Sequence, residues 1–128
     1  MATELNQNEL EKVVGGNDLG STAVTPETIL MRAKQELRKD YKWGGAGPEA
    51  YDAAGLVSYC ICGYHTHIGT TYTFLTWPKV TDPQPGDICV SANNCGIYVG
   101  GGSMIHATEG VGVHCGPVEG GMIYVRYE

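Results

Sequence analysis

The part of the chain after Pro85 consists of short apolar runs that are separated by glycines. Runs of this kind are typical of β-strands in a small antiparallel sheet. The 19 glycines of the 128-residue chain indicate many turns and close backbone approaches. We expect strands at 87–91, 95–99, 103–106, 111–115 and 122–127, with a further short strand around 72–75.

The part before residue 64 instead predicts helices. Thr25-Pro26-Glu27 provides an N-cap hydroxyl, a proline at the first helical position and an acid in the first turn, so a helix should run to about Asp40. Leu37 is expected on its buried face. Asp52 predicts the cap of a second helix over 53–62, closed by Gly63. Helices followed by a small antiparallel sheet indicate an α+β fold.

Charge and composition exclude several function classes. The net charge of −6, with no basic block, argues against nucleic acid and against an anionic membrane surface as partners. No apolar run approaches the roughly 20 residues that cross a bilayer. The five cysteines are an odd number, which rules out a complete disulfide framework.

The first sixteen residues combine a short apolar helix face with a terminal glycine pair. A narrow protease cleft can grip Gly15-Gly16, because no Cβ blocks close approach. This pattern resembles the double-glycine leader of bacteriocin-type precursors. The resemblance rests on Leu5, Glu9, Leu10, Val13, Gly15 and Gly16.

The leader resemblance implies a peptidase-containing ABC exporter as a partner. The exporter would cut the cytoplasmic precursor between Gly16 and Asn17, and the remainder would be secreted. An ordinary amphipathic helix that ends on a glycine C-cap is the alternative. The expected organisation is a leader at 1–16, a linker at 17–25 and one domain at 26–128.

Five motifs follow one another in that domain, at 41–45, 51–57, 85–88, 94–100 and 104–107. The glycine-rich loop that begins at Tyr41 is followed by the helix start at Asp52, and the strand motifs come after them. In this order the motifs resemble those of the NlpC-type cell-wall cysteine peptidases, which have a papain-like α+β fold.

The resemblance assigns roles to particular positions. Ala53 occupies the nucleophile position, Asn94 the general-base position and His106 the orienting position. Substrate contacts are implied for Tyr41, Trp43, Asp52 and Ala54. In such a site the helix N-terminus favours a cysteine thiolate, and a histidine transfers the proton.

Both bond-making groups are absent from this chain. Alanine has no nucleophile, and asparagine does not exchange a proton near neutral pH. We therefore predict an exported protein that resembles an endopeptidase of peptidoglycan stem peptides but does not cleave them. We expect no cofactor and no metal. The interpretation favoured for Ala53 is deliberate replacement of a cysteine, and a natural pseudoenzyme is the alternative. A non-catalytic wall-peptide binder, a bacteriocin-like effector and a cargo of the exporter are the alternative functions.

The remaining cysteines and histidines are predicted to be structural. Cys60, Cys62 and Cys95 are interpreted as packing residues, because none has the position of the nucleophile. The cluster Cys60, Cys62, His65 and His67 lacks zinc-knuckle spacing, so a loop beside buried cysteines is preferred. His114 is expected to be a surface strand residue.

Overall fold

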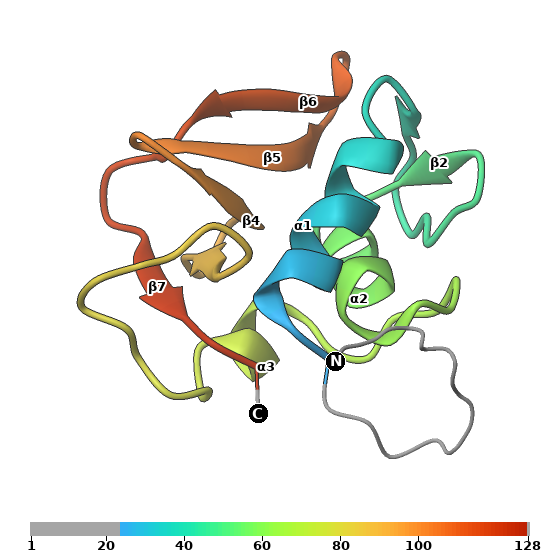
Figure 1. Ribbon diagram of the computed structural model, residues 1–128. Helices are drawn as coiled ribbons and strands as arrows, with labels where there is room; N and C mark the ends of the chain where they lie inside the picture. The colour runs from blue at the N-terminus through green and yellow to red at the C-terminus, as the bar shows by residue number, and fades with distance from the viewer. Residues whose placement is uncertain (1–23, 128) are drawn as a thin grey trace.

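The computed structural model describes residues 24–127, and its main sheet contains five antiparallel strands in the order β6-β5-β4-β3-β7. Strands β3 to β6 follow one another as neighbours, and β7 returns to pair with β3 (Figure 1). This arrangement confirms the expected antiparallel sheet. The strands are β3 (Ile88–Val90), β4 (Cys95–Gly100), β5 (Ser103–Thr108), β6 (Gly112–Pro117) and β7 (Ile123–Val125).

Two ten-residue helices lie side by side against one face of the sheet (Figure 1). They are α1 (Pro26–Gln35) and α2 (Ala53–Cys62). Between them in sequence, β1 (Asp40–Tyr41) and β2 (Ala50–Tyr51) form a short parallel pair. The result is the α+β layout that the order of sequence patterns predicted.

Helix α2 has the bounds that its capping residues predicted. Asp52 accepts a hydrogen bond from the Gly55 backbone N–H at 2.6 Å, and Gly63 ends the helix with φ 78°. At the same end, Nη1 of Arg32 donates to the carbonyls of Cys60 and Ile61 at 3.0 and 3.1 Å. A cation from α1 therefore pairs with the last carbonyl groups of α2, which also fixes the two helices to each other.

Helix α1 is shorter than the sequence predicted. It ends at Gln35 instead of continuing to about Asp40. The Arg38 N–H donates to the Val113 carbonyl at 2.8 Å, and the Val113 N–H donates to the Lys39 carbonyl at 2.8 Å. Pairing with β6 thus replaces the helical bonds of this segment, and Leu37 is exposed instead of buried.

The strand expected around 72–75 is wrong, because this segment is the helical turn α3 (Thr71–Phe74). The Thr70 N–H donates to Oγ1 of Thr73 at 3.1 Å, and the Phe74 N–H donates to the Thr70 carbonyl. Phe74 is fully buried and packs against Trp77. Local side-chain capping and one buried aromatic ring therefore outweigh the β-propensity of the threonines.

The core lies between the helices and one face of the sheet. Alternation along β4 and β5 directs Cys95, Ile97, Ile105 and Ala107 toward the helices. Asn94, His106 and Thr108 occupy the opposite parity on the same strands. The largest fully buried side chains include Tyr51, Leu56, Val57, Phe74, Ile88, Val90, Ile97, Met104, Ile105, Val113 and Val125.

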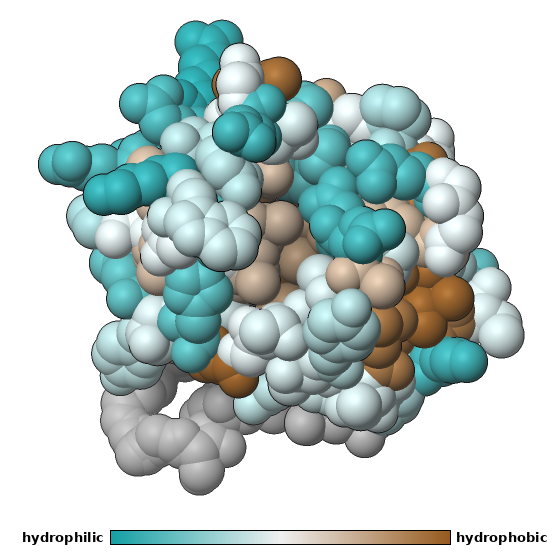
Figure 2. All heavy atoms as spheres, turned by 180° about the vertical axis from the view of Figure 1, so that it is seen from behind, coloured by the Kyte–Doolittle hydropathy of each residue, from teal (hydrophilic) through white to brown (hydrophobic). Residues whose placement is uncertain are grey.

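The surface seen from behind is mostly hydrophilic or neutral (Figure 2). Hydrophobic residues reach it in a hollow near the middle of this face and along its lower right edge. Over residues 24–127, the search for a helix of sufficient length and hydrophobicity to cross a bilayer finds none. The expected leader at 1–16 and most of the expected linker lie outside the described residues.

Candidate active site

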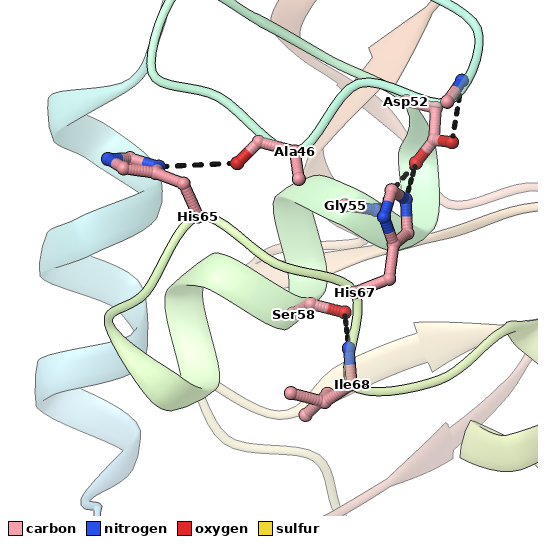
Figure 3. Close-up of polar contacts among 8 residues, drawn as sticks. Ala46, Asp52, Gly55, Ser58, His65, His67 and Ile68 are labelled. Carbon is pink, nitrogen blue, oxygen red and sulfur yellow. Dashed lines mark hydrogen bonds and ion pairs between the residues drawn. The ribbon is translucent and has the colours of Figure 1, made fainter.

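One wall of the candidate site is the N-terminus of α2, where Asp52 binds three segments of the chain (Figure 3). Its Oδ1 accepts from the Gly55 N–H at 2.6 Å and from Nε2 of His67 at 2.9 Å. Its Oδ2 accepts from the Gly44 N–H at 3.1 Å. The Asp52 carboxylate therefore caps the helix and also ties the glycine-rich loop and the 64–70 loop to it.

The glycine of the Gly-Leu-Val motif lets the glycine-rich loop approach this helix closely. Gly55 is buried, and a Cβ there would collide with the Gly45 carbonyl oxygen. The same carbonyl accepts from the Asp52 N–H at 2.9 Å. The glycine is thus required by packing at the site, and its presence alone says nothing about catalysis.

The loop 64–70 is fixed against the same wall (Figure 3). The Ala46 carbonyl accepts from Nδ1 of His65 at 3.2 Å, and the His65 ring stacks on Tyr59. Further along, Oγ of Ser58 accepts from the Ile68 N–H at 3.1 Å. His65 and His67 therefore each hold a loop through one ring nitrogen.

The opposite wall begins at Asn94, directly before β4. Its Nδ2 donates to Oε2 of Glu119 at 3.2 Å, and its Oδ1 accepts from the Cys95 N–H at 2.9 Å. Between the two walls is a pocket of about 220 Å³. The residues that line it are Tyr41, Ala53, Asn93, Asn94, Ala107, Thr108, Glu109 and Glu119.

Three of the residues predicted from the sequence therefore come together in this pocket: Tyr41, Ala53 and Asn94. Trp43, Asp52 and Ala54 are not among the lining residues. Trp43 is 86% exposed on the neighbouring loop, and Ala54 packs against the core. Of the predicted substrate contacts, Tyr41 thus lines the pocket, while Asp52 and Ala54 lie at the start of α2 outside the lining.

His106 lies on β5 directly before the lining residues Ala107 and Thr108, and it is buried and not itself part of the lining. Its Nδ1 is 3.2 Å from Oγ1 of Thr108, and its ring centre is 4.5 Å from that of His114. Burial lowers its pKa, and the neighbouring His114 lowers it further, against the opposing charge of Glu119. No hydrogen bond joins His106 to Asn94 in the described part of the chain.

Two features of this wall were missed by the sequence analysis. His114 is not a plain surface residue, because it is half-buried and shares Thr108 with His106. Glu119 lies 25 positions after Asn94, in a segment with no motif. The strand pairing of His106 with His114 and the path of the chain after β6 bring these residues to the site, and no local pattern indicates either.

The cysteines offer no alternative nucleophile at the pocket. Cys60, Cys89 and Cys95 are buried, and burial raises their thiol pKa, to about 12 for Cys89. Cys62 is half-buried, 3.5 Å from the Tyr64 carbonyl, and Cys115 is exposed. Within residues 24–127, no group of three or more histidine, cysteine or acidic side chains is arranged to hold a metal ion.

Comparison with known proteins covers most of the described chain. The sequence model of the NlpC/P60 family matches residues 38–127. A protein named probable endopeptidase p60, from Listeria grayi, is 30% identical in an alignment of 105 residues that covers 75% of this chain and 20% of that protein. The match covers the loop, the helix and the sheet that form the site.

Solved structures agree with this match. The NlpC/p60 domain of the peptidoglycan hydrolase SagA is 26% identical with a TM-score of 0.63, over 79% of this chain and 98% of that one. The peptidoglycan hydrolase RipB from Mycobacterium tuberculosis has a TM-score of 0.71, over 93% of this chain and 75% of that one. At 22% identity, the RipB likeness concerns the fold alone. The chain spans between 17% and 27% of the length of the curated relatives.

Proposed function

The chain belongs to the NlpC/P60 family, and on that premise we propose that its domain binds peptides of the bacterial cell wall without cleaving them. The observation that carries this proposal is the pocket shared by Ala53 and Asn94. A methyl group stands at the nucleophile position at the start of α2, and an amide stands at the base position before β4. The pocket is retained, but the two groups that make and break bonds are not.

The chemistry supports the absence of cleavage. A cysteine peptidase forms an acyl intermediate on a thiolate, and an imidazole protonates the leaving amine. Ala53 and Asn94 perform neither step. The buried cysteines do not replace the nucleophile, because the pKa of each thiol is raised and none lines the pocket.

Several features support binding of a peptide at this place. The pocket combines the Tyr41 ring and two alanine methyl groups with amides and carboxylates. Trp43 projects into solvent from the adjoining loop, where an aromatic ring is free to cover a ligand. SagA, whose domain has the same fold, is named a peptidoglycan hydrolase. Wall stem peptides, commonly cut by such enzymes at γ-D-glutamyl bonds, are the proposed ligands.

Binding and cleavage are tested with purified soluble stem peptides. Isothermal titration calorimetry should show binding, while chromatography should show no product. Ala53→Leu should fill the pocket and abolish binding, because the added side chain takes the space of the ligand. Ala92→Leu is the matched control, since Ala92 is exposed outside the pocket lining. Equal binding by Ala53→Leu and the parent would refute the pocket as the site.

The double variant Ala53→Cys with Asn94→His tests whether the residues at these two positions are the only reason that the domain does not cleave. Release of muropeptides by the double variant, with the parent inactive, would support a domain that lacks only its reacting groups. Cleavage by the parent would overturn the proposal directly. Binding by the parent with an inactive double variant would place the protein among wall-peptide binders that have diverged further.

We also propose that residues 1–16 act as a double-glycine leader for a peptidase-containing ABC exporter, and that the remainder is secreted. The support is the spacing of the apolar residues before Gly15-Gly16. Incubation with a peptidase domain of that class should cut the chain after Gly16, as measured by mass spectrometry. Gly16→Val should block the cut, because its side chain does not fit a narrow cleft. An uncut parent chain would remove the leader from the proposal.

A further inference from the structure

Two histidines form a direct cross-strand pair on the sheet face that carries Asn94. His106 of β5 and His114 of β6 lie opposite each other in the antiparallel register. Their ring centres are 4.5 Å apart and their planes are inclined by 43°, so the rings do not stack flat on each other. Strand pairing therefore holds two imidazoles within one small volume.

One nitrogen of each ring is directed at the same oxygen atom. Nδ1 of His106 is 3.2 Å from Oγ1 of Thr108, and Nε2 of His114 is 3.0 Å from it. A hydroxyl has a single proton, so it donates to one nitrogen and accepts an N–H from the other. Each neutral imidazole has one nitrogen without a proton. A change of tautomer in one of the two rings directs the unprotonated nitrogens of both rings at this point.

We propose that His106 and His114 bind a late first-row transition-metal ion, such as Zn²⁺, Ni²⁺ or Cu²⁺, at the position where their nitrogens converge on Thr108. Imidazole nitrogens are preferred ligands of these ions, at about 2.0–2.1 Å for Zn²⁺. Binding transfers the lone pairs of the two nitrogens to the ion and releases any proton that they carry. Thr108 and water complete the coordination shell.

The surroundings make this point accessible and favourable for a cation. Thr108 lines the pocket of the candidate site, which gives an ion a path from solvent. Glu109 and Glu119 line the same pocket, and the charge of Glu119 acts on His106. Two carboxylates at the entrance attract a divalent ion and oppose the repulsion between the ion and protonated imidazoles.

The sequence predicts no metal, since the one candidate cluster, at residues 60–67, lacks zinc-knuckle spacing, and His106 and His114 stand eight residues apart. Their separation of eight residues becomes a contact only through the hairpin of β5 and β6. A site with two protein nitrogens is open, since solvent or a ligand in the pocket occupies the remaining positions. Metal binding would thus fasten β5 to β6 directly behind the proposed peptide pocket.

The test uses the full chain, freed of metal with a chelator and titrated separately with Zn²⁺, Ni²⁺ and Cu²⁺. Calorimetry should show saturable binding near neutral pH that weakens on acidification, as protons compete for the imidazoles. His114→Gln should weaken binding at least about tenfold, because removal even of outer-shell partners of a metal costs 10–100-fold. Side-chain NMR of the parent should show that the ion perturbs His106 and His114.

Matched variants separate this site from the other metal-binding groups of the chain. His65→Gln should bind as the parent does, since His65 contacts the glycine-rich loop. Cys115→Ser should also keep binding, because Cys115 follows His114 and so points to the opposite sheet face. His106→Gln should lose binding, and circular dichroism would show whether that variant still folds.

The proposal is overturned if the parent binds none of the three ions more tightly than His114→Gln does. It is also overturned if His65→Gln, or a variant of Cys62, abolishes the binding that His114→Gln retains. His114 is half-buried, so its substitution should leave the core intact. The His114→Gln variant therefore still tests the proposal if His106→Gln does not fold.

Discussion

The two walls of the pocket are built in opposite ways. On the helix wall, the Asp52 carboxylate accepts three hydrogen bonds, and Gly55 is packed against the glycine-rich loop. On the strand wall, Asn94 makes an exposed side-chain contact with Glu119. The helix wall therefore performs structural work whether or not a nucleophile follows Asp52. The Asn94–Glu119 contact of the strand wall is exposed, so it should contribute less to stability than the bonds of Asp52.

This contrast explains why the helix wall stays in place whatever side chains stand at residues 53 and 94. Asp52 and Gly55 are held by capping and packing, which any domain of this fold needs. Ala53 and Asn94 are half-exposed and carry no comparable structural duty. An intact motif around a nucleophile position thus indicates the fold, and only the reacting groups themselves indicate activity.

The strongest test of the contrast is Gly55→Ala on the helix wall. We expect the free energy of unfolding to fall by about 3 kcal/mol, because the new methyl group overlaps the Gly45 carbonyl and crowds Ala46. Urea denaturation followed by circular dichroism measures the change. Gly120→Ala is the matched control, since its Cβ meets open space, and it should stay within about 0.5 kcal/mol of the parent. Similar losses of unfolding free energy in both variants would show that close packing at Gly55 does not stabilise the helix wall.

Asp52→Ala should have the next largest effect. Loss of the helix cap and of the bonds to Gly44 and His67 is expected to cost about 2 kcal/mol. The same denaturation experiment applies, with Asp82→Ala as the control, because Asp82 is exposed. A loss no greater than that of the control would show that the carboxylate does not hold the wall together.

His106 should give the strand wall a measurable dependence on pH. Its folded-state pKa is lowered by burial and by His114, so between that value and about 6.5 the unfolded chain binds more protons. The free energy of unfolding should therefore fall as the pH falls through about 6.5, and this contribution should be fully present above it. Urea denaturation at several pH values measures it.

His106→Gln should flatten that pH dependence relative to the parent, whatever its own stability at neutral pH. Ser58→Ala serves as the control, because Ser58 is also a buried polar residue but does not titrate in this range. It should keep the slope of the parent. An unchanged slope in His106→Gln would mean that burial of this ring does not disfavour its charged form.

Asn94→Ala should have the smallest effect. Its exposed contact with Glu119 should contribute no more than about 0.5 kcal/mol to the free energy of unfolding. Glu119→Ala removes that contact alone, whereas Asn94 also accepts the Cys95 N–H, so the loss for Glu119→Ala should be no larger than for Asn94→Ala. A loss near the value for Asp52→Ala would show that both walls are structural, and the contrast between them would fail.

Much of the fold was predictable from local sequence signals. Asp52 and Gly63 mark the two ends of α2, and the glycines between apolar runs mark the strands of the sheet. The two wrong expectations have a nonlocal origin. The end of α1 and the turn α3 depend on where Arg38 and Phe74 find partners, namely in β6 and in the core. Partners far along the chain override propensity at such boundaries.

The site was predictable where a motif supplies it, which is nearly all of the helix wall but only Asn94 and His106 on the strand wall. The stretch from Tyr41 to Val57 builds the helix wall nearly by itself, because its residues are neighbours in sequence and bond within a short loop and one helical turn. The strand wall needs residues from three separate segments. Thr108, His114 and Glu119 enter it through strand register and through the path after β6.

The sequence by itself determined the α+β class, the capped helix α2 and the absence of a nucleophile at residue 53. These follow from short-range chemistry, in which a cap, a turn or a reactive atom is present or absent at one position. The tertiary structure decided which groups surround that position. It paired His106 with His114 and carried Glu119 to Asn94. Such contacts depend on register and loop path, which are set by the packing of the whole domain and not by any one segment.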